Sequence, residues 1–130
     1  MKAPRVSIVV PVYGTAWCLR DCLQSLISQT VDEIEIIAIN DSSPDSAQEI
    51  LDEFSAGASR IRVIKNKENL NLFDTRRKGF SAASGEYITT CDSDDCLPPD
   101  AVEKLYNFAV DTQADIVDGR GNELGGLRDR

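Results

Sequence analysis

Residues 87–95 have the sequence YITTCDSDD, an apolar, β-prone run that is followed at once by acidic side chains. A run of this kind is typical of a strand that is covered on both faces. Asp92, Asp94 and Asp95 are so close in sequence that their carboxylates repel one another and contribute nothing obvious to folding. A divalent cation between them would reverse that balance, because Mg²⁺ and Mn²⁺ prefer oxygen ligands. The stretch therefore predicts a metal site at the carboxyl edge of a parallel sheet, with a polar surface turn as the alternative.

Strand-like and helix-like patterns alternate along the rest of the chain. Strands are expected near 5–12, 34–39, 61–64, 87–91 and 114–118, and helices near 17–28, 46–54, 73–84 and 98–109. This order predicts an α/β fold, a Rossmann-like three-layer sandwich with a mostly parallel sheet. Ser46 and Glu49 have the spacing of a capping box, and Gly85 is placed to end the third helix in the left-handed conformation.

The composition narrows the classes of function. The chain has 130 residues, enough for one domain, and its formal net charge of −8 argues against broad nucleic-acid binding. The same charge argues against docking of this segment to anionic lipid. No apolar run approaches the roughly 20 residues of a membrane span, and no signal peptide is indicated. The chain contains no His, so its chemistry has to use carboxylates, a metal or groups outside this chain.

Four cysteines are present, at Cys18, Cys22, Cys91 and Cys96. Cys18 and Cys22 are four residues apart on an expected helix, so they share a face. Without His and without a Cys-x-x-Cys pattern, a zinc site has little support. We expect reduced cysteines that serve as small core residues in a cytoplasmic protein.

The ends of three expected strands carry polar groups that can form one site. Ligands of parallel α/β sheets bind beyond the carboxyl ends of the strands, where Tyr13, Asp41 and residues 92–95 lie. Magnesium-type ions keep only one or two carboxylates and fill the other positions with water or phosphate oxygens, so a diphosphate is the natural further ligand. Arg76 and Lys78 could neutralise its charge, with a solvated helix face as their alternative role. The alternative for Asp41 is capping of the second helix.

Four segments form a pattern that is more specific than any one of them. They are VSIVVPVY at 6–13, NDSSPD at 40–45, the Arg76-x-x-Gly79 segment, and GEYI at 85–88 followed by DSDD at 92–95. In order and spacing they resemble the nucleotide-sugar half of a family 2 glycosyltransferase with the GT-A fold. The resemblance implies inverting transfer of a sugar from a nucleotide sugar, with a leaning to UDP, to an acceptor hydroxyl. It implies an acceptor glycan or lipid-linked sugar, as in cell-surface polysaccharide biosynthesis, and a location in the cytoplasm or at the membrane periphery through parts outside this chain.

The resemblance also implies roles for single residues. The implied nucleotide site has Pro11 and Tyr13 beside the nucleoside, Asp41 at the base, Arg76 near the diphosphate and Asp92 at the ribose or the metal. Asp94 is implied as the main ligand of a Mn²⁺ or Mg²⁺ ion. Gly14, Asn71 and Arg77 depart from the residues common in the family, which are Asn, Gly and Asn, and could alter donor preference.

The family's catalytic base lies well downstream of the metal motif, and no residue of this chain matches it. We therefore expect the base beyond Arg130, in an acceptor half that this chain lacks. The resemblance thus implies a truncated GT-A domain, with a donor-binding half over residues 1–118. Residues 119–130 are glycine-rich and charged, and we expect a flexible tail there.

Two alternatives to a donor-binding half stay open. A non-catalytic nucleotide-binding fragment is one of them, because the base is not matched. A receiver-like phosphoacceptor domain is the other, although no Lys follows the last expected strand at Asp118.

Overall fold

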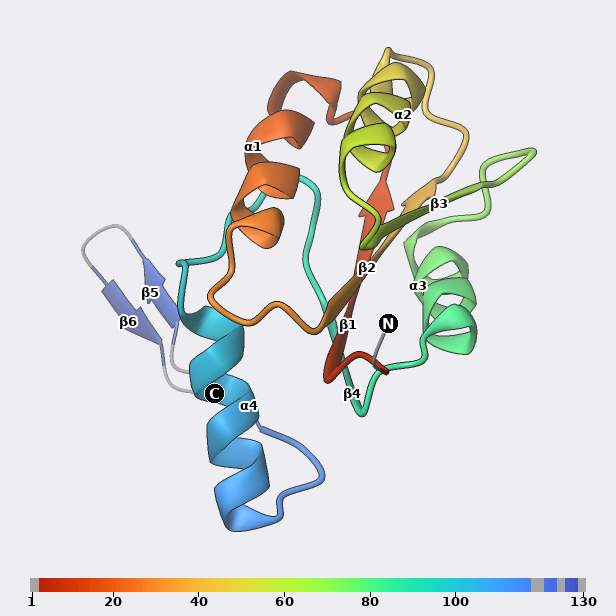
Figure 1. Cartoon of the computed structure of the whole chain (residues 1–130). Helices are drawn as coiled ribbons and strands as arrows, with labels where there is room; N and C mark the ends of the chain where they lie inside the picture. Colours follow the sequence, from red (N-terminus) through yellow and green to blue (C-terminus); the bar gives the residue numbers. More distant parts are fainter. Residues whose placement is uncertain (1–2, 118–120, 124–125, 129–130) are drawn as a thin grey trace.

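The computed structural model describes residues 3–117, 121–123 and 126–128. Four parallel strands form the central sheet in the order β3-β2-β1-β4: β1 (Val6–Val12), β2 (Ile34–Asn40), β3 (Ile61–Lys65) and β4 (Tyr87–Thr90). The helices are α1 (Ala16–Ile27), α2 (Ala47–Gly57), α3 (Leu72–Ala82) and α4 (Ala101–Thr112). Side chains of α1, α2 and α4 pack on one face of the sheet, and α3 covers the other (Figure 1). The predicted α/β sandwich with a mostly parallel sheet is confirmed.

The central strands β1 and β2 are buried at every residue. Successive side chains of a strand point to opposite faces, so Val10 packs with the helices α1 and α2 while Val9 packs under α3. Because both faces are covered, the two strands are almost continuously apolar, as is usual for central parallel strands. The sheet is therefore a packed platform, and the positions of its strand ends are set by this core.

Helix α3 approaches the sheet closely at Gly79. A Cβ atom added there would lie 2.3 Å from Cγ1 of Val9 and 3.1 Å from Cδ1 of Ile39. Only a residue without a side chain allows this separation between the helix and the sheet. The contact fixes the position of α3, and with it the position of Arg76 one turn earlier.

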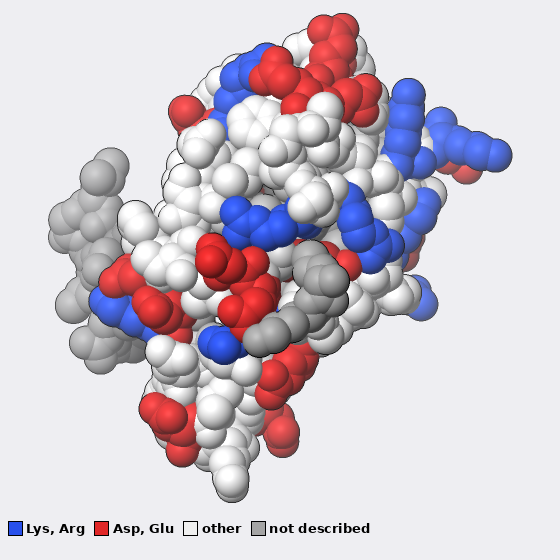
Figure 2. All heavy atoms as spheres, in the orientation of Figure 1, with Lys and Arg blue, Asp and Glu red and all other residues white. Residues whose placement is uncertain are grey.

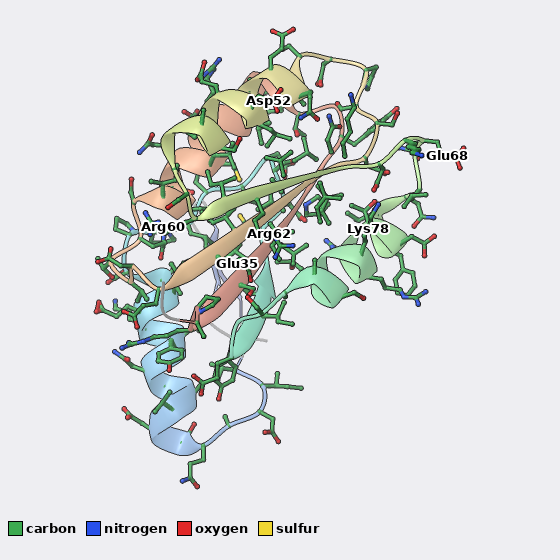
Figure 3. All side chains as sticks on the ribbon, turned by 45° about the vertical axis from the view of Figure 1, so that its right-hand side comes forward. Glu35, Asp52, Arg60, Arg62, Glu68 and Lys78 are labelled. Atoms are coloured by element: carbon green, nitrogen blue, oxygen red, sulfur yellow. The ribbon has the colours of Figure 1, made fainter. Side chains whose placement is uncertain are left out.

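A buried polar cluster lies between the sheet and α3, near the amino ends of the strands (Figure 3). Oε2 of Glu35 accepts hydrogen bonds from the Ser7 hydroxyl (2.6 Å) and from both the backbone N–H and the hydroxyl of Ser84 (3.0 Å each). Oε1 accepts a hydrogen bond from Nη1 of Arg62 (2.7 Å). Burial alone would raise the pKa of Glu35, but these hydrogen bonds outweigh it and lower the pKa to about 2.

The structure corrects the expected C-terminal part of the fold. Residues 114–117 form no strand, and Asp118 lies outside the described residues. Gln113 follows the last residue of α4 in the left-handed conformation (φ 55°). The carbonyl of Ala114 accepts a hydrogen bond from the side-chain hydroxyl of Tyr87 (2.6 Å) and not from the backbone of a neighbouring strand.

The segment expected to be a flexible tail, residues 119–130, contains regular structure. In it β5 (Gly121–Glu123) and β6 (Gly126–Arg128) form an antiparallel pair, and the expected flexibility of the segment stays a prediction. The catalytic base is expected beyond Arg130, outside this chain, so its position stays a prediction.

The strand β4 is an edge strand of the described sheet and is not covered on both faces, in contrast to the prediction. It pairs with β1 alone, and its residues are half-buried or exposed, with Ile88 44% exposed. A hollow of about 170 Å³ lies between β4 and α4.

The helix ends also differ from the expected capping. Ser46 makes no side-chain cap bond; instead Oδ1 of Asp45 accepts a hydrogen bond from the Ala47 N–H (3.1 Å). Gly85 does not end α3, and its φ is not positive. Glycine is required there because a Cβ would lie 2.6 Å from the backbone nitrogen of Ser7. Among the described residues, no helix has both the length and the apolar character needed to cross a membrane.

Candidate functional site

The carboxyl ends of β1, β2 and β4 open into one cleft of about 490 Å³, a common size for a small-molecule site. Its lining comes from four separate segments: Pro11, Val12, Tyr13, Thr15, Asp41, Asn69, Asn71, Leu72, Thr75, Asp92, Ser93 and Asp94. Five of the six residues predicted from the sequence, namely Pro11, Tyr13, Asp41, Asp92 and Asp94, therefore lie around the same cleft. They meet because parallel strands bring their carboxyl ends to one edge of the sheet.

Asp41 is buried at this cleft, with 4% of its surface exposed. Its Oδ1 accepts hydrogen bonds from Nδ2 of Asn66 (2.9 Å) and the N–H of Leu70 (2.8 Å), and Oδ2 accepts one from the N–H of Asn71 (3.2 Å). Burial would raise the pKa of Asp41, but these donors lower it. Asp41 therefore stays ionised and organises the loop before α3, and the capping role goes to Asp45.

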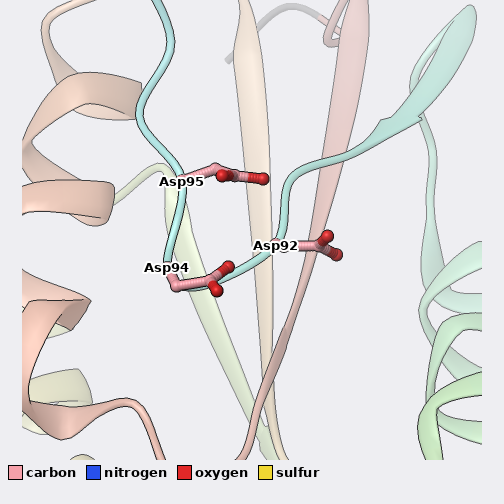
Figure 4. A group of neighbouring side chains, drawn as sticks. All are labelled: Asp92, Asp94 and Asp95. Atoms are coloured by element: carbon pink, nitrogen blue, oxygen red, sulfur yellow. The ribbon is translucent and has the colours of Figure 1, made fainter. Parts of the chain in front are cut away.

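The acidic turn after β4 brings three carboxylates together. One oxygen each from Asp92, Asp94 and Asp95 lies within 4.8 Å of the others (Figure 4). Burial and the charges of Asp94 and Asp92 raise the pKa of Asp95, so the carboxylates destabilise one another. Because Mg²⁺ holds oxygens at about 2.0–2.1 Å, small side-chain rotations would bring these atoms to one ion. The donor set therefore fits Mn²⁺ or Mg²⁺, and it includes Asp95, to which the family resemblance assigned no role.

Arg76 reaches the acidic turn from α3. Its Nη2 donates a hydrogen bond to Oδ1 of Asp92 at 3.0 Å, while its Nε is buried without a hydrogen-bond partner. Lys78 is directed elsewhere, because its Nζ donates to Oδ1 of Asn66 (2.8 Å). Of the two cations expected near a diphosphate, Arg76 is the one that contacts the acidic turn.

The turn that carries Tyr13 is tied to the loop after β2. Gly14 has a φ of 69° and donates its N–H to Oγ of Ser43 (2.9 Å), and the N–H of Ala16 donates to Oδ2 of Asp45 (3.1 Å). The left-handed φ explains why Gly can replace the Asn common in the family, since both residue types tolerate it. Tyr13 is thereby held at the cleft with 53% of its surface exposed.

Ser93 lines the cleft although the sequence did not predict it as a site residue. It is buried, its hydroxyl lies 2.6 Å from that of Thr15, and its carbonyl accepts a weak hydrogen bond from the Cys18 thiol (3.6 Å). The sequence Asp-Ser-Asp could have indicated a buried Ser93, because the middle residue can point away from the two carboxylates beside it. Ser93 anchors the acidic turn to the start of α1.

The cysteines are free, as expected, but only part of the expected burial is confirmed. Cys22 and Cys91 are buried, whereas Cys18 is half-buried and Cys96 is exposed. Cys96 is therefore not a core residue, because it lies in the turn that leaves the sheet.

The fold and its acidic edge define an α/β domain of the GT-A type. The chain belongs to glycosyl transferase family 2, whose model matches residues 7–123. It is 44% identical to EpsH of Bacillus subtilis over 117 residues, which are 90% of this chain and 33% of EpsH. The chain thus spans about a third of the length of this relative.

Solved structures share the fold. TarS 1–349 of Staphylococcus aureus in complex with UDP-GlcNAc superimposes with a TM-score of 0.81 at 23% identity, over 92% of this chain and 37% of that one. A mannosyltransferase from Pyrobaculum calidifontis in complex with GDP-Man and Mn²⁺ gives a TM-score of 0.73 at 22% identity, over 92% and 35%. The family and the fold expected from the resemblance are both confirmed.

Proposed function

We propose that this chain is the donor-binding half of an inverting glycosyltransferase and that it holds a UDP-sugar through Mn²⁺ or Mg²⁺. The observation that carries the proposal is one cleft with an ionised, buried Asp41 on one side and the acidic turn on the other. The complexes of TarS with UDP-GlcNAc and of the mannosyltransferase with GDP-Man and Mn²⁺ support it, because both proteins have this fold.

Each residue would act according to its position. The exposed ring of Tyr13, beside Pro11, packs against the nucleoside, and the carboxylate of Asp41 accepts hydrogen bonds from the base. Asp94 is the main metal ligand, and Asp92 binds the ribose or the metal. A bound divalent cation would act as a Lewis acid on the leaving diphosphate.

The acceptor hydroxyl has to lose a proton, and no described residue is assigned as its base. Asp115 lines the separate hollow between β4 and α4, away from the cleft, and Asp118 lies outside the described residues. We place the base beyond Arg130, together with the site for an acceptor glycan or lipid-linked sugar, in parts of the protein outside this chain. A cytoplasmic, membrane-peripheral location stays a prediction.

Calorimetry with UDP in the presence of Mn²⁺ tests the site. We expect Asp94→Asn to weaken UDP binding at least about tenfold, because the metal bridges the protein and the diphosphate. Asp111→Asn is the matched control, since it removes the same charge from an exposed position on α4. Equal binding with and without Mn²⁺, or an Asp94→Asn variant that binds like the control, would contradict the proposal.

The alternative, a nucleotide-binding fragment without catalysis, requires a different measurement. If the 130-residue chain itself hydrolyses UDP-sugars or transfers the sugar, this alternative fails. Donor binding without turnover is the result expected for a donor-binding half.

A further inference from the structure

The ion pair between Arg76 and Asp92 occupies part of the proposed metal site. Nη2 of Arg76 lies 3.0 Å from Oδ1 of Asp92, one of the three carboxylates that approach within 4.8 Å. Figure 4 shows the Asp92 side chain extending away from Asp94 and Asp95, toward the side where α3 lies. Within the described part of the chain, Arg76 is the cation that already balances charge at this turn.

The guanidinium of Arg76 also has an unused donor. Its Nε is buried and has no hydrogen-bond partner, although Nη2 is bonded to Asp92. Nε and Nη2 lie on one edge of the guanidinium, and this edge can bind two oxygens side by side. A diphosphate offers two such oxygens, whereas the present contact uses one. A bound diphosphate could therefore satisfy both donors of this edge, whereas the present contact with Asp92 satisfies one.

We infer that Arg76 makes metal binding depend on the nucleotide. In the free chain Arg76 holds Asp92 and opposes the cation; when the diphosphate arrives, Arg76 transfers to phosphate and releases Asp92 to the ion. This inference rests on the proposed function. A cation that binds before the nucleotide is repelled by the guanidinium of Arg76 and finds Asp92 already bonded to it. A cation that binds after the nucleotide finds the charge of Arg76 balanced by phosphate and Asp92 released. The nucleotide and the metal therefore enhance each other's binding by the same factor.

Removing the guanidinium separates this effect from the direct contact between metal and diphosphate. In Arg76→Gln we expect Mn²⁺ without nucleotide to bind roughly tenfold more tightly, and UDP without metal to bind more weakly. Free Mn²⁺ measured by electron paramagnetic resonance gives the first affinity, and calorimetry gives the second. Arg76→Lys, which keeps the charge, should return the Mn²⁺ affinity toward that of the unchanged chain.

Arg77→Gln is the matched control, because it removes the same charge from the next residue, whose side chain is 69% exposed and whose Nη1 is 4.0 Å from Asp74. A double-mutant cycle adds a second measurement: Asp92→Asn should reduce Mn²⁺ binding more strongly in the Arg76→Gln background than in the unchanged chain. Circular dichroism confirms that each variant is folded.

The outcomes distinguish the inference from the function on which it rests. Mn²⁺ affinity that is unchanged in Arg76→Gln, or that rises equally in Arg77→Gln, overturns the inference while Mn²⁺-dependent UDP binding remains. If the unchanged chain binds no Mn²⁺ even with UDP, the proposed function and the inference both fail. Tighter Mn²⁺ binding in Arg76→Gln alone supports the inference.

Discussion

Asp41 and Glu35 are both buried carboxylates on or beside β2, and their surroundings give them different roles. The donors to Glu35 are Ser7, Arg62 and Ser84, which do not line the cleft, so this carboxylate stabilises the fold. The donors to Asp41 include backbone N–H groups of the loop before α3, and Asp41 itself lines the cleft. A buried charge that borders a cleft is available to a ligand, whereas an enclosed one is not.

Glu35→Gln should remove a pH-dependent part of the stability. The folded pKa of about 2 lies below the ordinary value of 4.5, so the stabilisation is present above pH 4.5 and is lost as the pH falls toward 2. As the pH falls across this range, the free energy of unfolding of the unchanged chain, measured in urea, should therefore decrease by on the order of 2–3 kcal/mol more than that of Glu35→Gln. The exposed Glu53→Gln is the control. Parallel pH curves for the unchanged chain and Glu35→Gln would contradict the assignment.

The backbone conformation of Asn71 is expected to lower the stability of the fold. Its φ of 119° and ψ of 169° lie in a region that is essentially reserved for glycine, while its side chain caps α3 by accepting from the Asp74 N–H. Asn71→Gly relieves strain of about 1–3 kcal/mol and loses a few tenths for the cap, so we expect it to stabilise the fold by about 1 kcal/mol. The urea midpoint measures this, and a lower midpoint would mean that the cap outweighs the strain.

At the scale of elements, α3 connects the core to the site. Gly79 sets its distance from the sheet, the loop before it surrounds Asp41, and Arg76 on its first turns contacts Asp92. A displacement of this helix would therefore alter both sides of the cleft together.

Gly79→Ala should test this packing. Alanine favours helix by up to about 1 kcal/mol, but its Cβ would approach Cγ1 of Val9 to 2.3 Å, so the helix has to move. We expect a net destabilisation of about 1–3 kcal/mol in urea unfolding, together with weaker UDP binding. Ser81→Ala, at an exposed position of the same helix, should change stability by less than about 0.5 kcal/mol. A stabilised Gly79→Ala would show that the close approach does not limit the packing.

At the scale of the whole molecule, net charge and local charge differ. The chain has a formal net charge of −8, yet Figure 2 shows Lys and Arg side chains gathered on the right-hand side, where Figure 1 places β3 and α3. An acidic net charge therefore does not exclude a local basic region, which here lies on the side of β3 and α3.

Ligand binding should raise the stability of the whole chain. UDP and Mn²⁺ at about 100 times their dissociation constants should add about 2.7 kcal/mol, because they bind the folded state alone. For a chain of this size we expect a Tm increase of several degrees in a thermal-shift measurement. Asp94→Asn should show no increase that depends on Mn²⁺. An equal increase with UDP alone would contradict a metal-mediated site.

The sequence by itself determined the alternation of elements and the edge at which the site lies. Apolar periodicity specifies strands and helices locally. Because the carboxyl ends of parallel strands lie at one edge of the sheet, Tyr13, Asp41 and Asp92, which follow three of these strands, meet there. The expected strand at 114–118 was wrong because an apolar run does not show whether a partner strand is within reach.

The tertiary structure alone decided which groups touch at that edge. Loop residues that hold Asp41, the hydroxyl pair of Thr15 and Ser93, and the contact of Arg76 with Asp92 join segments that are far apart along the chain. No local pattern encodes such contacts, because they depend on strand order and on the distance between α3 and the sheet. That distance is set by the missing Cβ of Gly79, and it places the Arg76 guanidinium 3.0 Å from the carboxylate of Asp92.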